Sequence, residues 1–212
     1  MSEDAAYRAT VLGKAYAGID RLPVTVLLDR VRSLYNVGSF FRTADAVRAE
    51  AIVLAGITPT PDDPRIAKTA LGAERSVAWS KAADTAAAID GLRARGHEIT
   101  AIETSLHAVD LFDWQPRFPV CVVFGHEVEG IPQALLERCD VHVRIPTLGA
   151  KGSINVATAG GVVLYELLRK YRGLIPGSKD PALRQSQGRP ELRRRAGLRH
   201  RRREPNPGEP QT

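Results

Sequence analysis

Cysteine is scarce in this sequence. The 212 residues include two, Cys121 inside an apolar run and Cys139 beside an aspartate. Two cysteines in unrelated settings favour a reducing compartment and a structural role over a disulfide framework. His126 lacks Cys or His partners at ligand spacing, so we expect no metal site. A chain of this length buries about two-thirds of its unfolded surface, which supports a core without such cross-links.

Long apolar runs are absent as well. No stretch approaches the roughly 20 apolar residues that span a membrane. The N-terminal segment lacks the basic start and the apolar stretch of a secretory signal. We therefore expect a soluble, cytoplasmic protein without a membrane partner.

Two common nucleotide-binding motifs are also missing. The chain has no GK[ST] at the spacing of a Walker phosphate loop, which excludes that loop. No G-x-G-x-x-G follows the first apolar run at 23–29, so a dinucleotide-binding fingerprint fits poorly. Ligand loops in this chain are therefore of neither type.

Most of the chain lacks an excess of charge of either sign. Residues 1–172 hold 20 basic and 20 acidic residues, whereas residues 173–212 hold ten and four, which accounts for the net charge of +6. The basic residues concentrate in RRRAGLRHRRR at 193–203, ahead of a Pro/Gly-rich end. This tail is either a solvated terminus or an arm that binds a polyanion such as nucleic acid.

Short apolar runs alternate with helical patterns along the rest of the chain. Several runs are apolar without alternation, as expected for strands covered on both faces. Strands that alternate with helices predict an α/β fold, with a mostly parallel sheet flanked by helices. The predicted strands are 23–29, 51–56, 77–80, 98–103, 119–125 and 141–146; the predicted helices are 37–48, 64–72, 82–95, 132–138 and 153–172.

The composition divides the chain into three parts. Residues 1–21 predict an amphipathic N-terminal helical extension, and residues 22–175 predict the α/β domain. Pro176 and Gly177 mark the end of that domain. Residues 176–212 form the basic tail, whose few apolar residues and many like charges predict disorder.

Parallel sheets bind ligands beyond the C-terminal ends of their strands. This rule selects the loops after Asp29, Phe124 and Ile145. In the first loop, three residues also have purely structural interpretations. Asn36 could cap the following helix, and Arg42 could be a surface charge. Gly38 could be present because packing there leaves no room for a side chain.

The other two selected loops are rich in glycine. In the second, Glu127 and Glu129 suit acid/base chemistry or complement the dipole of the following helix. The third loop enters a helix through residues 153–155, and the small residues at 157–161 allow another element to approach closely.

The three loops carry three spaced motifs. They are Asn36, Gly38 and Arg42; Gly125, Glu127 and Gly130; and Ile145, Pro146, Ser153, Ile154, Asn155 and Val156. In order and spacing they resemble the three motifs of the SpoU/TrmH-type RNA ribose 2′-O-methyltransferases, within the SPOUT superfamily. The resemblance covers about residues 22–172. Ile154 and Ala157 depart from it, since the family usually has Leu and Ser there.

The resemblance implies a fold, a cofactor and a substrate. It implies a C-terminal trefoil knot that forms the site for S-adenosyl-L-methionine, and a homodimer with the active site at its interface. The reaction implied is methylation of a ribose 2′-hydroxyl in tRNA or rRNA. By the same resemblance, Gly125, Ile145 and Ile154 bind the cofactor, and Arg42 lies beside the target ribose with Asn36, Glu127, Ser153 and Asn155 around it.

The role of Arg42 and the class of protein both have alternatives. A guanidinium titrates above about pH 12, so Arg42 as general base needs a strong perturbation, whereas a phosphate clamp or charge stabiliser does not. The sequence leaves both roles open. The rival classes are a non-catalytic RNA-binding module that uses the basic C-terminal tail, and an α/β enzyme acting on a small phosphorylated metabolite.

Overall fold

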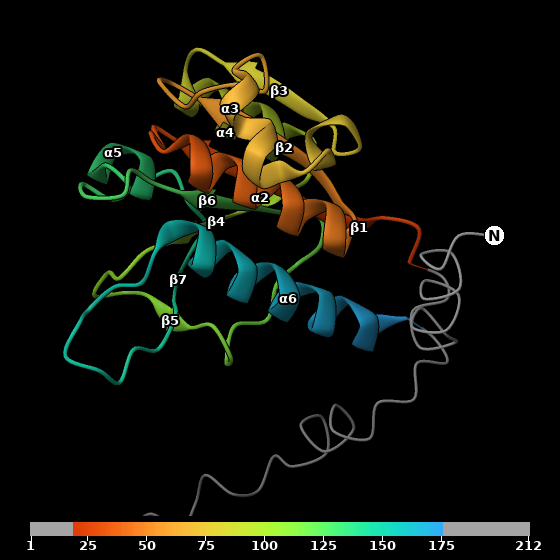
Figure 1. Ribbon diagram of the computed structural model, residues 1–212. Coiled ribbons are helices and arrows are strands. Elements are labelled where there is room, and N and C mark those ends of the chain that lie inside the picture. The colour runs from red at the N-terminus through yellow and green to blue at the C-terminus, as the bar shows by residue number, and fades with distance from the viewer. Residues whose placement is uncertain (1–18, 176–212) are drawn as a thin grey trace, which may run out of the picture. The chain divides into compact units, whose positions relative to one another are not determined.

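The computed structural model describes residues 19–175, so the tail and nearly all of the predicted N-terminal helix lie outside the described residues. Within that range the chain forms a seven-stranded sheet in the order β3-β2-β1-β6-β4-β7-β5 (Figure 1). Every pairing is parallel, which confirms the predicted α/β class. The strands are β1 (Leu22–Asp29), β2 (Ala49–Ala55), β3 (Trp79–Ala82), β4 (Glu98–Ile102), β5 (Val109–Asp110), β6 (Val120–Phe124) and β7 (Val141–Arg144).

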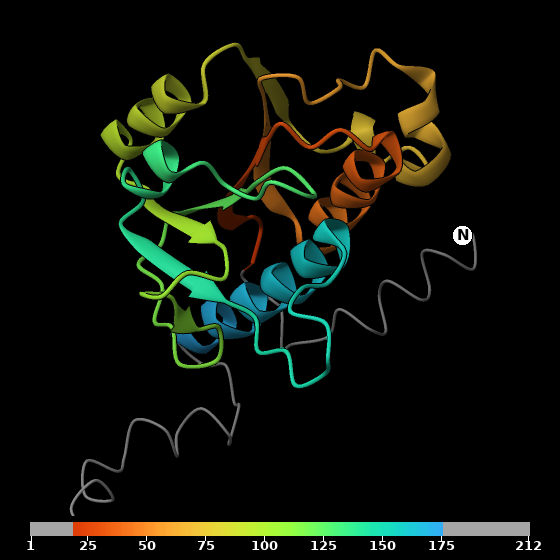
Figure 2. The ribbon, with the colours of Figure 1, turned by 90° about the vertical axis from the view of Figure 1, so that its left-hand side faces the viewer.

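Helices cover both faces of this sheet. Figure 2 shows α2 and α6 on one side of the sheet and α4 and α5 on the other. Each side encloses its own apolar core, because strand side chains such as Val26 and Leu27 point alternately to the two faces. No helix in residues 19–175 is long and apolar enough to cross a membrane. The helices are α2 (Leu34–Val47), α3 (Pro64–Ala70), α4 (Thr85–Ala94), α5 (Gln133–Leu136) and α6 (Val156–Leu174), with a 3-10 turn at Ala73–Arg75.

Three predicted helix starts were wrong by three residues each, and side-chain caps explain them. The predicted helix 82–95 begins at Thr85, because the Asp84 carboxylate accepts the N–H groups of Ala86 and Ala87. The predicted helix 37–48 begins earlier, at Leu34, because the Ser33 hydroxyl accepts the N–H of Asn36. The predicted helix 153–172 begins later, at Val156, because the Asn155 side chain caps it. Strand β5 was missed, since two residues carry no periodic pattern.

Glycines let α2 approach two neighbouring helices closely. A Cβ atom on Gly38 would lie 2.6 Å from the carbonyl oxygen of Ile66 in α3. A Cβ atom on Gly160 of α6 would lie 2.2 Å from the ring of Phe40 in α2. Both observations agree with the packing interpretation of these small residues, and they fix the position of α2 against its neighbours.

The close contact at Gly38 predicts an unusual response to alanine. Gly38→Ala forces α2 away from α3, so we expect it to lower the free energy of unfolding by about 1–3 kcal/mol. The matched control is Gly91→Ala in α4, where the nearest atom to a new Cβ is 3.9 Å away. In Gly91→Ala, the higher helix propensity of alanine should raise the free energy of unfolding by up to about 1 kcal/mol. Urea unfolding measures both, and equal effects would contradict the packing argument.

Candidate active site

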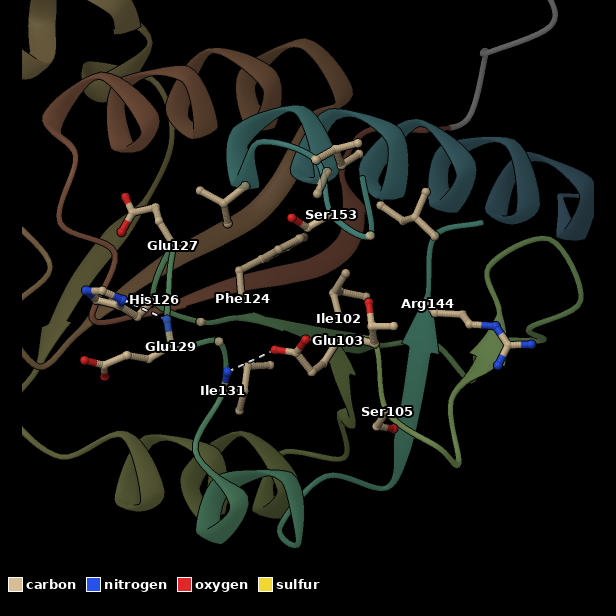
Figure 3. A pocket seen from close by; sticks show the side chains of 18 of the residues that line it. Ile102, Glu103, Ser105, Phe124, His126, Glu127, Glu129, Ile131, Arg144 and Ser153 are labelled. Carbon is tan, nitrogen blue, oxygen red and sulfur yellow. Dashed lines mark hydrogen bonds between the residues drawn. The ribbon is translucent and has the colours of Figure 1, made fainter. Parts of the chain in front are cut away.

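A cavity of about 850 Å³ opens at the C-terminal ends of β6, β4 and β7 (Figure 3). This volume lies within the usual range for small-molecule sites, about 300–1,000 Å³. It brings together six of the eight residues that the sequence selected for the site. They are Gly125 and Glu127 from the second loop, and Ile145, Ser153, Ile154 and Asn155 from the third.

The second loop makes a narrow turn at the edge of the cavity. His126 and Gly130 exchange two backbone hydrogen bonds across it, at 3.2 and 2.9 Å. A Cβ atom on Gly125 would lie 2.4 Å from the carbonyl oxygen of Gly130, so only glycine fits there. Gly130 itself has a φ of +69°, which also favours glycine. The turn therefore depends on both glycines and leaves its main chain open to the cavity.

Glu127 ties this turn to the first loop. Its carboxylate accepts the N–H groups of Arg32 and Ser33, both at 3.1 Å, and the side-chain amide of Asn36 at 3.0 Å. Burial raises the pKa of Glu127, but these three hydrogen bonds outweigh burial and bring the pKa below its ordinary value. At neutral pH the group is therefore an ionised acceptor. It is suited to holding the two loops together rather than to taking up a proton.

Asn36 extends the connection to the third loop. Its Oδ1 atom accepts a hydrogen bond of 3.1 Å from the Nδ2 atom of Asn155. Asn155 in turn accepts the N–H groups of Ala157 and Thr158 with its own Oδ1 and so caps α6. The interpretation of Asn36 as the helix cap was wrong, because Ser33 holds that position. Asn36 is thereby free to join Glu127 to Asn155.

The sequence did not select Glu103 or Arg30, which brace the second loop from its other sides. Glu103 lines the cavity and accepts the N–H of Ile131 at 3.0 Å (Figure 3). The guanidinium of Arg30 lies 2.8 Å from the carboxylate of Glu129. Glu103 ends the predicted strand 98–103, so the rule of strand ends would have found it if applied to that strand too. Arg30 carries no comparable signal.

His126 also has a structural role in this turn. Its Nδ1 atom accepts the N–H groups of Val128 and Glu129 at 3.1 and 3.2 Å. In residues 19–175 no three His, Cys, Asp or Glu side chains lie close enough together to hold a metal ion. The imidazole therefore stabilises the loop that frames the cavity.

Arg42 does not line this cavity. It is exposed on α2, two turns beyond Asn36, and faces a second cavity of about 470 Å³. Two of the eight selected residues are therefore not in the lining of the first cavity. Asn36 borders it through hydrogen bonds to Glu127 and Asn155, and Arg42 lies apart from it in the single chain.

The composition of the first cavity fits an amphipathic small ligand. Apolar side chains such as Phe124 and Ile131 form part of its wall, next to polar groups such as Ser153 and Glu103. Main-chain groups of two bent loops are within reach of such a ligand and pair with it at little entropic cost. The site is thus suited to a small organic ligand that has both apolar and polar parts.

Several proteins of similar sequence or structure are named as RNA methyltransferases. A 23S rRNA (uridine(2479)-2'-O)-methyltransferase of Streptomyces viridochromogenes is 32% identical over 161 residues, covering 72% of this chain and 56% of that protein. The 23S rRNA (guanosine-2'-O-)-methyltransferase RlmB of Ralstonia nicotianae is 33% identical over 160 residues, covering 75% and 63%. The crystal structure of an AdoMet-bound rRNA methyltransferase from Sinorhizobium meliloti matches with a TM-score of 0.65 and 33% identity, covering 69% and 56%.

These similarities cover the described domain rather than whole relatives. The chain spans 56–61% of the length of three curated relatives that it matches. The SpoU rRNA Methylase family profile matches residues 23–165, which include all three motifs and about the first half of α6. The chain belongs to the SpoU rRNA Methylase family.

Proposed function

We propose that this protein transfers a methyl group from S-adenosyl-L-methionine to a ribose 2′-hydroxyl in tRNA or rRNA. The observation that carries the proposal is the convergence of two family motifs on one cavity, with Asn36 of the remaining motif hydrogen-bonded to both. Two named relatives that methylate 2′-hydroxyl groups of 23S rRNA support the reaction class.

The cavity suits the cofactor in size and in the main chain that it offers. In this proposal Gly125, Ile145 and Ile154 hold it, largely through backbone groups. The cofactor supplies an electrophilic methyl group on a sulfonium sulfur. The chain supplies the alignment, because a reaction between two bound groups depends on their fixed geometry. The hydrogen bonds of Glu127 and Asn36 fix the loops that provide that geometry.

Arg42 acts on the RNA rather than on the cofactor in this proposal. Its exposure on α2, outside the cofactor cavity, supports that assignment. A guanidinium pairs with a phosphate through two hydrogen bonds and stabilises negative charge on a reacting oxygen. Ser153 and Asn155 remain with the cofactor cavity, where Asn155 also caps α6.

The knot implied by the resemblance and the domain limits drawn from the composition are part of the same proposal. We take residues 22–175 as the methyltransferase domain and its C-terminal segment as threaded into a trefoil knot. Two contacts hold the start of α6 against α2 and support its place in the domain: Asn155 donates to Asn36, and Gly160 packs on Phe40.

Replacing Arg42 tests whether this residue acts on the RNA and not on the cofactor. We expect Arg42→Ala to lower methyl transfer to RNA by at least about 100-fold, the effect of losing one charge-stabilising group. Cofactor affinity should stay unchanged. The matched control is Arg95→Ala, which removes an exposed arginine after α4, on the other side of the sheet. Transfer of labelled methyl groups and titration calorimetry measure the two quantities.

The outcomes of that experiment separate the proposal from its rivals. Methylated nucleosides recovered from the RNA must carry the methyl group on the 2′-oxygen. A wild-type protein that binds no cofactor at millimolar concentration, or that methylates a base, would sink the proposed function. Loss of cofactor binding in Arg42→Ala, with the fold intact, would refute the assignment of Arg42 to RNA.

A homodimer explains why Arg42 lies apart from the cofactor cavity. We propose, as the resemblance implies, that the active site forms between two copies of this chain. Gly161 on α6 supports this proposal, because a Cβ atom there would meet nothing within 4 Å. Next to it on α6, Val162 is an exposed apolar side chain. The glycine therefore has no packing role within one chain.

Substitution at Gly161 distinguishes a free surface from an interface. Gly161→Gln adds a bulky polar side chain that one chain has room for, so the variant should still fold, as its circular dichroism spectrum would show. If the surface packs against a second copy, the variant should be monomeric in light scattering and weakly active, while Gly161→Ala remains closer to the wild type. A dimeric, fully active Gly161→Gln would count against this interface.

A further inference from the structure

The second cavity lies between three helices and is separate from the cofactor cavity. Its volume is about 470 Å³, and none of its lining residues lines the larger cavity. Residues from α2, α3 and α6 form it. They are Ser39, Arg42, Thr43, Ala46, Lys68, Thr69 and Tyr165.

The charges around this cavity are all of one sign. Arg42 and Lys68 line it, and no carboxylate does. Both side chains are exposed, and neither forms an ion pair with another residue in 19–175. By contrast, Arg30 and Arg138 are each held by a carboxylate. Two uncompensated cations at one cavity favour an anionic ligand.

The other lining groups suit an oxygen-rich ligand. The Thr43 hydroxyl donates to the carbonyl oxygen of Ser39 at 3.0 Å, and the Thr69 hydroxyl lies 3.3 Å from the carbonyl oxygen of Ile66. Each hydroxyl retains lone pairs that can accept a further hydrogen bond. Tyr165, with 55% of its surface exposed, adds a ring at the α6 side. Cations, hydroxyls and a ring together match a phosphate, a ribose and a base.

We propose that Lys68, together with Arg42, binds a backbone phosphate of the substrate RNA in this second cavity. The inference rests on the proposed function and adds a residue that lies outside all three motifs. The cations are exposed rather than enclosed, which suits a passing strand better than a small metabolite. Lys68 is a positioning residue in this scheme: it holds the strand beside Arg42 and takes no part in the methyl transfer itself.

The test compares Lys68→Ala with Arg95→Ala, which removes the same charge away from the cavity. Fluorescein-labelled total tRNA and fragmented rRNA serve as probes, and their affinities are measured by anisotropy over a salt series. We expect Lys68→Ala to weaken RNA binding by roughly fivefold to tenfold. The slope of log affinity against log salt should become shallower by about 0.7–0.9, the effect of losing one phosphate contact.

Kinetics separate positioning from folding. Lys68→Ala should raise the KM for RNA and leave kcat, cofactor affinity and urea unfolding unchanged, and Lys68→Arg should restore the affinity. Equal affinities and slopes for Lys68→Ala and Arg95→Ala would overturn the inference. So would a variant that loses binding of inorganic phosphate but not of RNA. Because RNA binding is measured without methylation, a wild-type protein that binds but does not methylate RNA would refute the proposed function alone.

Discussion

The ionised carboxylate of Glu127 is the contact on which the arrangement of this site depends. It accepts two backbone N–H groups from the first loop and the amide of Asn36, while its own main chain belongs to the turn after β6. Asn36 then accepts from Asn155, which begins α6. Three segments far apart in sequence are thereby held at neighbouring strand ends. Losing the carboxylate would remove the shared acceptor of these three donors and so release the turn from the first loop.

Beneath these hydrogen bonds, apolar packing fixes how far α2 and α6 lie from the sheet. The rings of Phe40 and Phe124 lie 5.0 Å apart at 58°, so α2 rests on the strand that leads into the turn. Gly160 brings α6 onto the same Phe40 ring. The helix that carries Arg42 is therefore fixed relative to the cofactor cavity, although Arg42 itself faces away from it. This geometry separates a cavity suited to a cofactor from a cationic cavity suited to RNA.

The sequence predicted the sheet and most of the cavity, because apolar runs and strand ends obey local rules. The strand-end rule selected the loops that carry Gly125, Glu127 and Asn155, and the family resemblance gave these residues their roles. Local rules do not predict contacts between residues far apart in the sequence. The hydrogen bond between Glu127 and Asn36, for example, joins residues that are 91 positions apart. The sequence did not predict that Ser33 caps α2, because a single hydrogen bond determines which of several polar residues is the cap. Lys68 belongs to no motif, and only the packing of α3 on α2 places it near Arg42.

Cofactor affinity in a double-mutant cycle tests the central claim most directly. The variants are Glu127→Ala, Asn36→Ala and the pair, each titrated with S-adenosyl-L-methionine by calorimetry. Ser33 still caps α2 in all of them, so the helix itself should persist. If the two side chains hold the loops together as one unit, each single variant should weaken cofactor binding. The double variant should then lose little more affinity than either single variant, with a coupling energy of about 0.5–3 kcal/mol. Losses that simply add, or an Asn36→Ala variant with wild-type affinity, would contradict the account.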